Sequence, residues 1–125
     1  MVARPDLAGQ RLQKPGNPAI WLIDCDGLKR WIPDPDTYNN LFRDWNGIVQ
    51  DTELDNITPG HPISHGALLA KDPNTAPVWL VDHDLHVKRW VSSPAAMDQF
   101  HFNWDKIQQV SNFVLDAIWS GNQIC

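Results

Sequence analysis

The sequence has few cysteines and no long hydrophobic run. Two cysteines in 125 residues do not make the disulfide framework of a small secreted domain, so Cys25 and Cys125 are interpreted as free thiols. No apolar run reaches the roughly 18 residues of a membrane span, and the start MVARPDLAGQ lacks the apolar stretch of a signal peptide. We therefore expect no membrane insertion, and a cytoplasmic location by default or release by a non-classical route.

Positive charge is also scarce. Ten Lys and Arg residues against fifteen Asp and Glu residues give a formal net charge of −5. Because affinity for nucleic acids depends on clustered positive charge, the balance excludes a nucleic-acid partner. The sequence also lacks a GxSxG motif and a phosphate-binding glycine loop, and its acidic residues fall mostly in turns. These absences predict a protein that is not an enzyme.

The chain does have an internal duplication. IWLIDCDGLKRWIP at 20–33 recurs as VWLVDHDLHVKRWVS at 78–92, and the flanking segments recur as well. Such self-similarity is typical of repeat architectures, and it divides the chain into units of about 9–63 and 66–124. One unit of roughly 60 residues buries too little surface to be robust alone, so we expect residues 1–125 to form a single domain with a shared core.

Each unit contains the pattern of a β-hairpin. Runs rich in β-branched and aromatic residues flank the turn at 24–27, where Gly27 can adopt a positive φ. The segments RLQ and ALLA upstream of the two hairpins are expected to add a third strand to each sheet. The second hairpin has HDLH at 83–86, without the glycine, so its turn should differ in type.

Short helices should follow each hairpin. Asp34-Pro35 and Ser93-Pro94 each supply a helix N-cap followed by proline at the first helical position. A second helical turn is expected over 53–57 and 112–118. The predicted fold class is α+β, with two tandem pseudo-symmetric repeats, each a β-hairpin or three-stranded antiparallel sheet with short helices. An all-β repeat barrel or prism stays open as the alternative.

The seven tryptophans are unusually many for a chain of this length. Large aromatic side chains fill a small two-layer core efficiently. Two hairpin registers are open: one places Asp24 opposite Lys29, and the other, shifted by one residue, places Trp21 opposite Trp31. The tryptophans expected in the core are Trp21, Trp45, Trp79, Trp104 and one of the two hairpin tryptophans, Trp31 and Trp90.

Each hairpin also gathers carboxylates, a lysine, an arginine and a tryptophan. In one interpretation Asp24 with Lys29, and Asp82 with Lys88, form surface ion pairs of small energetic value. In the other interpretation, the charged residues and the tryptophan of each hairpin form a sugar site. An indole stacks on the apolar face of a pyranose ring, and charged side chains bind the hydroxyl groups of the ring. Two weak sites on one scaffold would reinforce each other. The candidate sugar-binding residues are Asp24, Asp26, Lys29, Arg30, Trp31, Asp82, Asp84, Lys88, Arg89 and Trp90.

A metal site is not expected. DCDG at 24–27 resembles the start of an EF-hand loop, but Lys29 and Arg30 stand where further oxygen ligands are required. His83 and His86 flank Asp84 in the second turn without a counterpart in the first unit or a third convergent ligand. We therefore predict metal-independent binding and no cofactor.

The stretches WLIDCDGLKRWIPDP and WLVDHDLHVKRWVSSP resemble a short repeat of the form VWLVDxDGxKRWIPSP, which GFxW and LxxIPxG segments follow. That repeat is associated with bacterial envelope and secreted proteins, often beside domains that degrade cell walls or polysaccharides. The likeness runs from Gly9 to Ile124. It implies glycan or envelope binding and carries over no residue role. The second unit departs from the pattern in its turn and in having Ser92 where the first has Pro33.

We therefore predict a non-catalytic, lectin-like carbohydrate-binding protein with about one site per repeat. Its expected partner is a glycan or cell-surface polysaccharide, and a homo-oligomer is left open. The alternative is a protein–protein interaction module, such as an inhibitor or an envelope adaptor, because tryptophan and arginine are common at binding hot spots.

Overall fold

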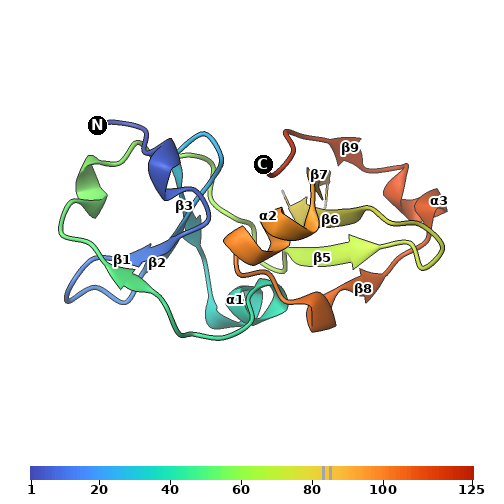
Figure 1. The fold of residues 1–125 in the computed structure, drawn as a ribbon, viewed down its shortest axis with the longest axis horizontal. Coiled ribbons are helices and arrows are strands. Elements are labelled where there is room, and N and C mark those ends of the chain that lie inside the picture. The colour runs from blue at the N-terminus through green and yellow to red at the C-terminus, as the bar shows by residue number, and fades with distance from the viewer. Residues whose placement is uncertain (83, 85) are drawn as a thin grey trace.

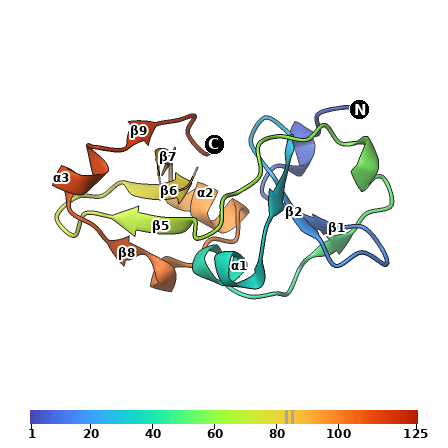
Figure 2. The same ribbon diagram turned by 180° about the vertical axis from the view of Figure 1, so that it is seen from behind.

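The computed structural model describes residues 1–82, 84 and 86–125. This described part is a mixed α/β structure with nine strands in two sheets and three short α-helices. The sheet of the first half and that of the second lie at opposite ends of the molecule, with helices α1 and α2 between them (Figure 1). Seen from behind, the green connection that leads into β5 crosses from one half to the other (Figure 2).

The sheet of the first half has the strand order β3-β2-β1-β4. Its first three strands run antiparallel, and the short β4 pairs in parallel with β1. Two 3-10 turns, η1 and η2, flank the sheet in the sequence. The elements are η1 (Pro5–Leu7), β1 (Arg11–Gln13), β2 (Ile20–Ile23), β3 (Lys29–Ile32), α1 (Pro35–Leu41), β4 (Val49–Gln50) and η2 (Leu54–Asn56).

The sheet of the second half has the order β8-β5-β6-β7-β9. Strands β5, β6 and β7 run antiparallel, and the short β8 and β9 pair in parallel with β5 and β7. The three-stranded sheet expected in each unit is therefore present with extra edge strands. The elements are β5 (Leu68–Lys71), β6 (Val78–Asp82), β7 (Val87–Val91), α2 (Pro94–Gln99), η3 (Trp104–Lys106), β8 (Gln108–Gln109), α3 (Asn112–Leu115) and β9 (Trp119–Ser120).

Local chemistry accounts for the first hairpin turn. Gly27 has a φ of 82°, and a Cβ there would collide with the backbone of Arg4 and Pro5. The Asp24 carboxylate accepts the backbone N–H groups of Asp26 and Leu28 at 2.9 Å each, which closes the turn. The prediction for the second turn at 83–86 concerns His83 and Leu85, which lie outside the described residues.

The helix starts are as predicted. Asp34 and Ser93 are the N-caps of α1 and α2, and their side chains accept the backbone N–H groups of Thr37 at 2.7 Å and Ala96 at 3.1 Å. The regular helices and the two open sheets show that the alternative of an all-β barrel or prism is wrong. The apolar patterns of these helices are too short to decide this from the sequence.

The largest core cluster contains residues from both halves. Within it, Phe42 of the first half and Phe102 of the second pair through an antiparallel bridge, with their ring centroids 5.6 Å apart. The Asn103 N–H donates to the Leu41 carbonyl at 2.8 Å across the same seam. Members of this cluster are Leu22, Ile32, Tyr38, Leu41, Phe42 and Ile63, together with Ala67, Leu69, Val78, Leu80, Val91, Ala96, Met97, Phe100, Phe102 and Ile124.

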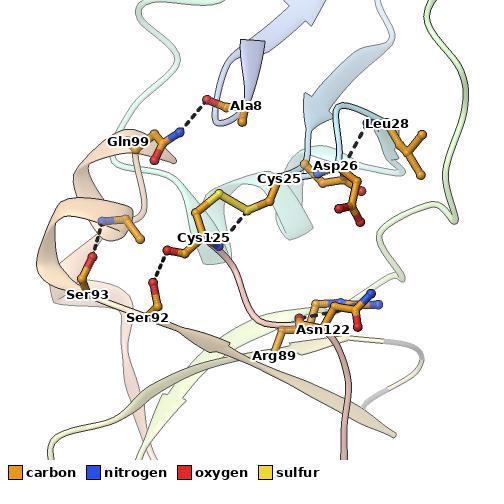
Figure 3. The surroundings of a disulfide bond; sticks show 12 residues. Ala8, Cys25, Asp26, Leu28, Arg89, Ser92, Ser93, Gln99, Asn122 and Cys125 are labelled. Carbon is orange, nitrogen blue, oxygen red and sulfur yellow. Dashed lines mark hydrogen bonds between the residues drawn. A yellow bond between two sulfur atoms is a disulfide. The ribbon is translucent and has the colours of Figure 1, made fainter. Parts of the chain in front are cut away.

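The interpretation of the cysteines as free thiols is wrong. Cys25, in the first hairpin turn, and Cys125 form a disulfide, with Cα atoms 5.6 Å apart (Figure 3). A separation of 100 residues in the sequence gives no signal of this proximity. The fold creates it, because the last residues of the chain run back beside β7 to the seam between the halves, where the first hairpin turn lies.

Candidate functional site

The hairpins adopt the shifted register. Trp21 lies opposite Trp31, and Trp79 lies opposite Trp90. Because side chains alternate along a strand, Lys29 and Trp31 are on one face of β3 and Arg30 is on the other. The residues of the predicted sugar site are consequently divided between two faces of each hairpin.

The two lysines of the predicted site are buried rather than paired with carboxylates. The Lys29 ammonium donates to the carbonyl of Leu54 at 3.0 Å, and the Lys88 ammonium donates to that of Leu115 at 2.6 Å. The expected surface pairs of Asp24 with Lys29 and of Asp82 with Lys88 are therefore wrong. Each lysine thus connects its hairpin to the helical segment that follows in the same half, η2 for Lys29 and α3 for Lys88.

Five other predicted residues lie at a cleft between the halves, which we call the central cleft. They are Asp24, Asp26, Arg30, Asp82 and Arg89. The cleft has a volume of about 40 Å³, enough for a few water molecules. Pockets that bury small organic ligands usually measure about 300–1,000 Å³. The central cleft therefore has no room for a sugar ring.

The two arginines of the central cleft have different partners. Arg30 donates from Nε to Asp24 at 2.6 Å, in a pair with both side chains largely buried. Asp82, the counterpart of Asp24 in the sequence, instead accepts the N–H and hydroxyl of Ser64 at 2.9 Å each. Consequently the buried Arg89 Nε has no hydrogen-bond partner among the described residues.

Burial lowers the pKa of the Arg89 guanidinium below its ordinary value, and the nearby positive charge of Arg30 lowers it further. The carboxylates of Asp82 and Asp24 act in the opposite direction. Asp26 and Asp84 are exposed, and Asp84 has a positive φ of 56°.

The remaining two predicted residues, Trp31 and Trp90, lie in larger hollows of the surface. The first groove measures about 340 Å³ and the second about 250 Å³. The first groove is defined by Asn17, Pro18, Ala19, Ile20, Trp31, Ile32, Pro33, Asp34, Pro35, Tyr38 and Trp45. The second groove is defined by Ala76, Pro77, Val78, Trp90, Val91, Ser92, Ser93, Pro94, Met97 and Trp104.

Each groove combines a hairpin tryptophan with a tryptophan that follows the helix. Trp31 and Trp45 are 39% and 45% exposed, and Trp90 and Trp104 are 40% and 46% exposed. Exposure is thus nearly equal at the corresponding positions of the two halves. The expectation that Trp45 and Trp104 lie in the core is wrong, because Tyr38 and Met97 fill that space together with Phe42, Phe100 and Phe102.

The indole of Trp45 is held in place on two sides. It stacks on Tyr38 with ring centroids 3.9 Å apart, and its Nε1–H donates to Asn39 at 2.9 Å. One indole face is therefore covered, while nearly half of the side chain stays exposed at the first groove. A fixed, half-exposed indole provides a flat apolar platform at low cost in side-chain entropy.

Polar side chains of the grooves include the helix N-caps Asp34 and Ser93, beside Asn17 in the first groove and Ser92 in the second. Asp34 contributes a carboxylate to the first groove, and Ser92 and Ser93 contribute hydroxyls to the second. The backbone N–H of Thr37 holds the pKa of the Asp34 carboxyl below its ordinary value; burial opposes this shift, and the paired imidazole of His65 supports it. Asp34 therefore stays ionised in mildly acidic solution.

Sequence reasoning identified Trp31 and Trp90 but missed the other groove residues. The signal was present, because Pro35 with Pro94 and Trp45 with Trp104 recur at matching positions. What the sequence did not show is that these residues lie beside the hairpin tryptophan and on the surface.

The described residues also bear on membrane spanning and metal binding. No helix there is long and apolar enough to cross a membrane. Over the same part of the chain, no group of three or more His, Cys, Asp or Glu residues is arranged to hold a metal ion. No protein-family model, curated protein or solved structure matches the chain, so the candidate site is defined by its own geometry.

Proposed function

We propose that the protein is a non-catalytic, lectin-like glycan-binding protein whose two sites are the first and second grooves. The observation that carries the proposal is the pair of half-exposed indoles in each groove, at corresponding positions of the two halves. Indole faces stack on the apolar faces of pyranose rings, and the N-cap side chains beside them bind hydroxyl groups. Proline residues in each groove keep its walls rigid.

The proposal includes the duplication itself. We propose that the halves are two copies of one pseudo-symmetric unit, so the chain has two similar sites. A glycan polymer that reaches both grooves would bind more tightly than a single sugar unit, because the second contact is intramolecular. The grooves differ in polar groups, a carboxylate in the first and hydroxyls in the second, so their sugar preferences should differ.

The proposed site keeps Trp31 and Trp90 as direct ligands. Lys29 and Lys88 have structural contacts instead. Asp24, Arg30, Asp82 and Arg89 lie at the central cleft, so we assign them to the seam between the halves. A direct sugar contact by Arg30 and Arg89 is the competing prediction.

A glycan array followed by titration calorimetry tests the site. With a glycan selected on the array, wild type should give about two sites per chain, and Trp31→Ala and Trp90→Ala should each give about one. Trp119→Ala is the matched control, because Trp119 is 81% exposed and lies outside both grooves. Binding in EDTA should equal binding in calcium. The groove assignment fails if Trp31→Ala and Trp90→Ala bind like wild type.

Arginine variants separate the grooves from the central cleft. Arg30→Ala and Arg89→Ala should leave the number of sites unchanged. If each instead removes one site while the fold stays intact, the hairpin arginines are the sugar ligands and the grooves are not the sites.

A protein-interaction module is the second candidate function. It is favoured by the apolar surface of α3 and β9, where Phe113 is 90% exposed and Trp119 is 81% exposed. Such large exposed aromatic side chains are common at protein interfaces. Two results together would support this function in place of the lectin proposal. The protein would bind no glycan, and it would bind a protein partner that the double variant Phe113→Ser/Trp119→Ser no longer binds.

The disulfide is relevant to the cellular compartment in which the protein is located. Disulfides persist in oxidising environments and are rare in reducing ones. Together with the resemblance to repeats of envelope and secreted proteins, the Cys25–Cys125 pair favours an oxidising compartment over the expected cytoplasmic default. We include this location in the proposal, and the redox state of the two cysteines in protein taken directly from its source cells tests it.

A further inference from the structure

One short segment connects the disulfide to the second groove. Residues 122–125, which we call the strap, run beside β7 and form one wall of the central cleft. The Ile124 N–H donates to the Trp90 carbonyl at 2.8 Å, and the Ser92 N–H donates to the Ile124 carbonyl at 3.2 Å. The Ser92 hydroxyl donates to the Cys125 carbonyl (Figure 3). The strap thus contacts two residues of the second groove, Trp90 and Ser92.

Few other contacts fix the strap. Asn122, Gln123 and Cys125 are exposed, and only Ile124 reaches the shared core. Arg89 adds a long hydrogen bond of 3.4 Å to the Asn122 carbonyl. The covalent link from Cys125 to Cys25 holds the strap against the first half of the molecule, and the Cys125 N–H also donates to the Cys25 sulfur at 2.7 Å (Figure 3).

The first half has a matching segment that needs no disulfide. The Ile63 N–H donates to the Trp31 carbonyl at 3.0 Å, as Ile124 does to Trp90. Ile63, however, lies in continuous chain between η2 and β5, and its side chain is 1% exposed. Its position beside β3 is therefore fixed by the chain on both sides.

We propose that the Cys25–Cys125 disulfide is a redox latch that holds the strap beside the second groove and leaves the first groove unaffected. The consequence for binding rests on the proposed function of the grooves, whereas the latch itself does not. Cys125 is exposed and Cys25 is partly exposed, so a small dithiol approaches the disulfide from the side of Cys125.

The chemical step is thiol–disulfide exchange with a dithiol. One thiolate of the reductant attacks a protein sulfur, forms a mixed disulfide and releases the other cysteine as a thiolate, which takes up a proton. The second thiolate of the reductant closes its own disulfide and releases the second cysteine, which is protonated in turn. Two electrons pass from the dithiol to the protein, and Cys25 and Cys125 become free thiols.

Amide hydrogen exchange measured by NMR on the full chain, oxidised and after dithiothreitol treatment, tests the latch. Reduction should make the Ile124 and Ser92 amides exchange about tenfold faster or more, because a segment with few buried contacts opens locally. The Ile63 amide should lose protection by a clearly smaller factor than the Ile124 amide, because the chain fixes it on both sides. The indole N–H signal of Trp90 should shift, and that of Trp31 should not.

Two variants complete the test. Cys25→Ser/Cys125→Ser should reproduce the reduced protein without reductant. Ser92→Ala keeps the disulfide and removes one strap contact, so its Ile124 amide should stay protected. Unchanged exchange at Ile124 on reduction would overturn the latch, as would equal loss of protection at Ile124 and Ile63. Loss of protection in Ser92→Ala would assign the role to that hydrogen bond instead. None of these readouts requires a sugar, so failure of glycan binding is a separate result.

Discussion

Lys88 donates from its buried ammonium to the Leu115 carbonyl at 2.6 Å, while the ammonium lies 4.6 Å from the centroid of the Trp79 ring. Lys29 makes the corresponding contacts with Leu54 at 3.0 Å and with the Trp21 ring at 4.8 Å. These lysines satisfy a buried carbonyl and cover a partly buried indole, so their role is structural.

Replacing either lysine should therefore destabilise the fold. Lys88→Met and Lys29→Met keep the side-chain volume but leave a buried carbonyl without its donor, which should lower the free energy of unfolding by about 1–3 kcal/mol. Lys106→Met is the matched control, because Lys106 is exposed, and it should change stability by less than about 0.5 kcal/mol. Urea unfolding measures all three. Equal stability of Lys88→Met and Lys106→Met would show that the contact contributes nothing.

The disulfide should contribute strongly to global stability. It joins residues 100 positions apart, and closing a loop of that length restricts the unfolded chain by about 4–5 kcal/mol in the chain-entropy model. Urea unfolding of wild type with and without dithiothreitol should show this difference. Cys25→Ser/Cys125→Ser should match the reduced wild type and should not respond to dithiothreitol. A loss below about 1 kcal/mol would contradict the expectation.

The two helix N-caps should respond differently to pH. Asp34→Ala and Ser93→Ala should each cost about 1 kcal/mol near neutral pH, because each removes the acceptor for a backbone N–H. The pKa of Asp34 in the folded protein is lowered from 3.8, first of all by the Thr37 N–H. Its contribution is thus fully present above the unfolded pKa and disappears as the pH falls through the lower, folded pKa.

The measurement is a series of urea titrations from neutral to strongly acidic pH. The stability difference between wild type and Asp34→Ala should shrink as the pH falls, whereas the difference for Ser93→Ala should stay constant because a hydroxyl does not titrate in this range. Parallel behaviour of the two variants would mean that the charge of Asp34 adds nothing to its capping role.

A shared core predicts that neither half folds robustly alone. Residues 1–64, expressed separately, lose every core partner from the second half, including Leu69, Leu80 and Phe102. We expect this fragment to show no cooperative thermal transition and poor dispersion of its amide NMR signals. A cooperative transition in the fragment would contradict the single-domain prediction, which so far stays a prediction.

Much of the secondary structure could be predicted from the sequence, because it depends on neighbours in the chain. Gly27 supplies the positive φ of the first turn, and Asp34 and Ser93 cap the helices whose first residues are Pro35 and Pro94. The hairpin register could not be predicted, because both faces of β2 and β3 carry apolar residues and alternation then favours neither arrangement.

The candidate site depended on tertiary packing. Seven tryptophans in a small chain suggested a tryptophan core, yet Trp31, Trp45, Trp90, Trp104 and Trp119 are exposed. Smaller apolar groups pack with Phe42, Phe100 and Phe102 in the seam between the halves. Four of the indoles, those of Trp31, Trp45, Trp90 and Trp104, remain at the grooves. Which large side chain is buried depends on the shape of the space between two sheets, and no local pattern specifies that shape.

The sequence by itself determined the hairpin strands and the capped helices, because these depend mainly on interactions between residues a few positions apart. Only the tertiary structure decided that Lys29 and Lys88 are buried, that Cys25 meets Cys125, and that four of the seven tryptophans line two grooves. These features join segments tens of residues apart. Their contacts form only in the folded protein, so the order of residues along the chain does not reveal them.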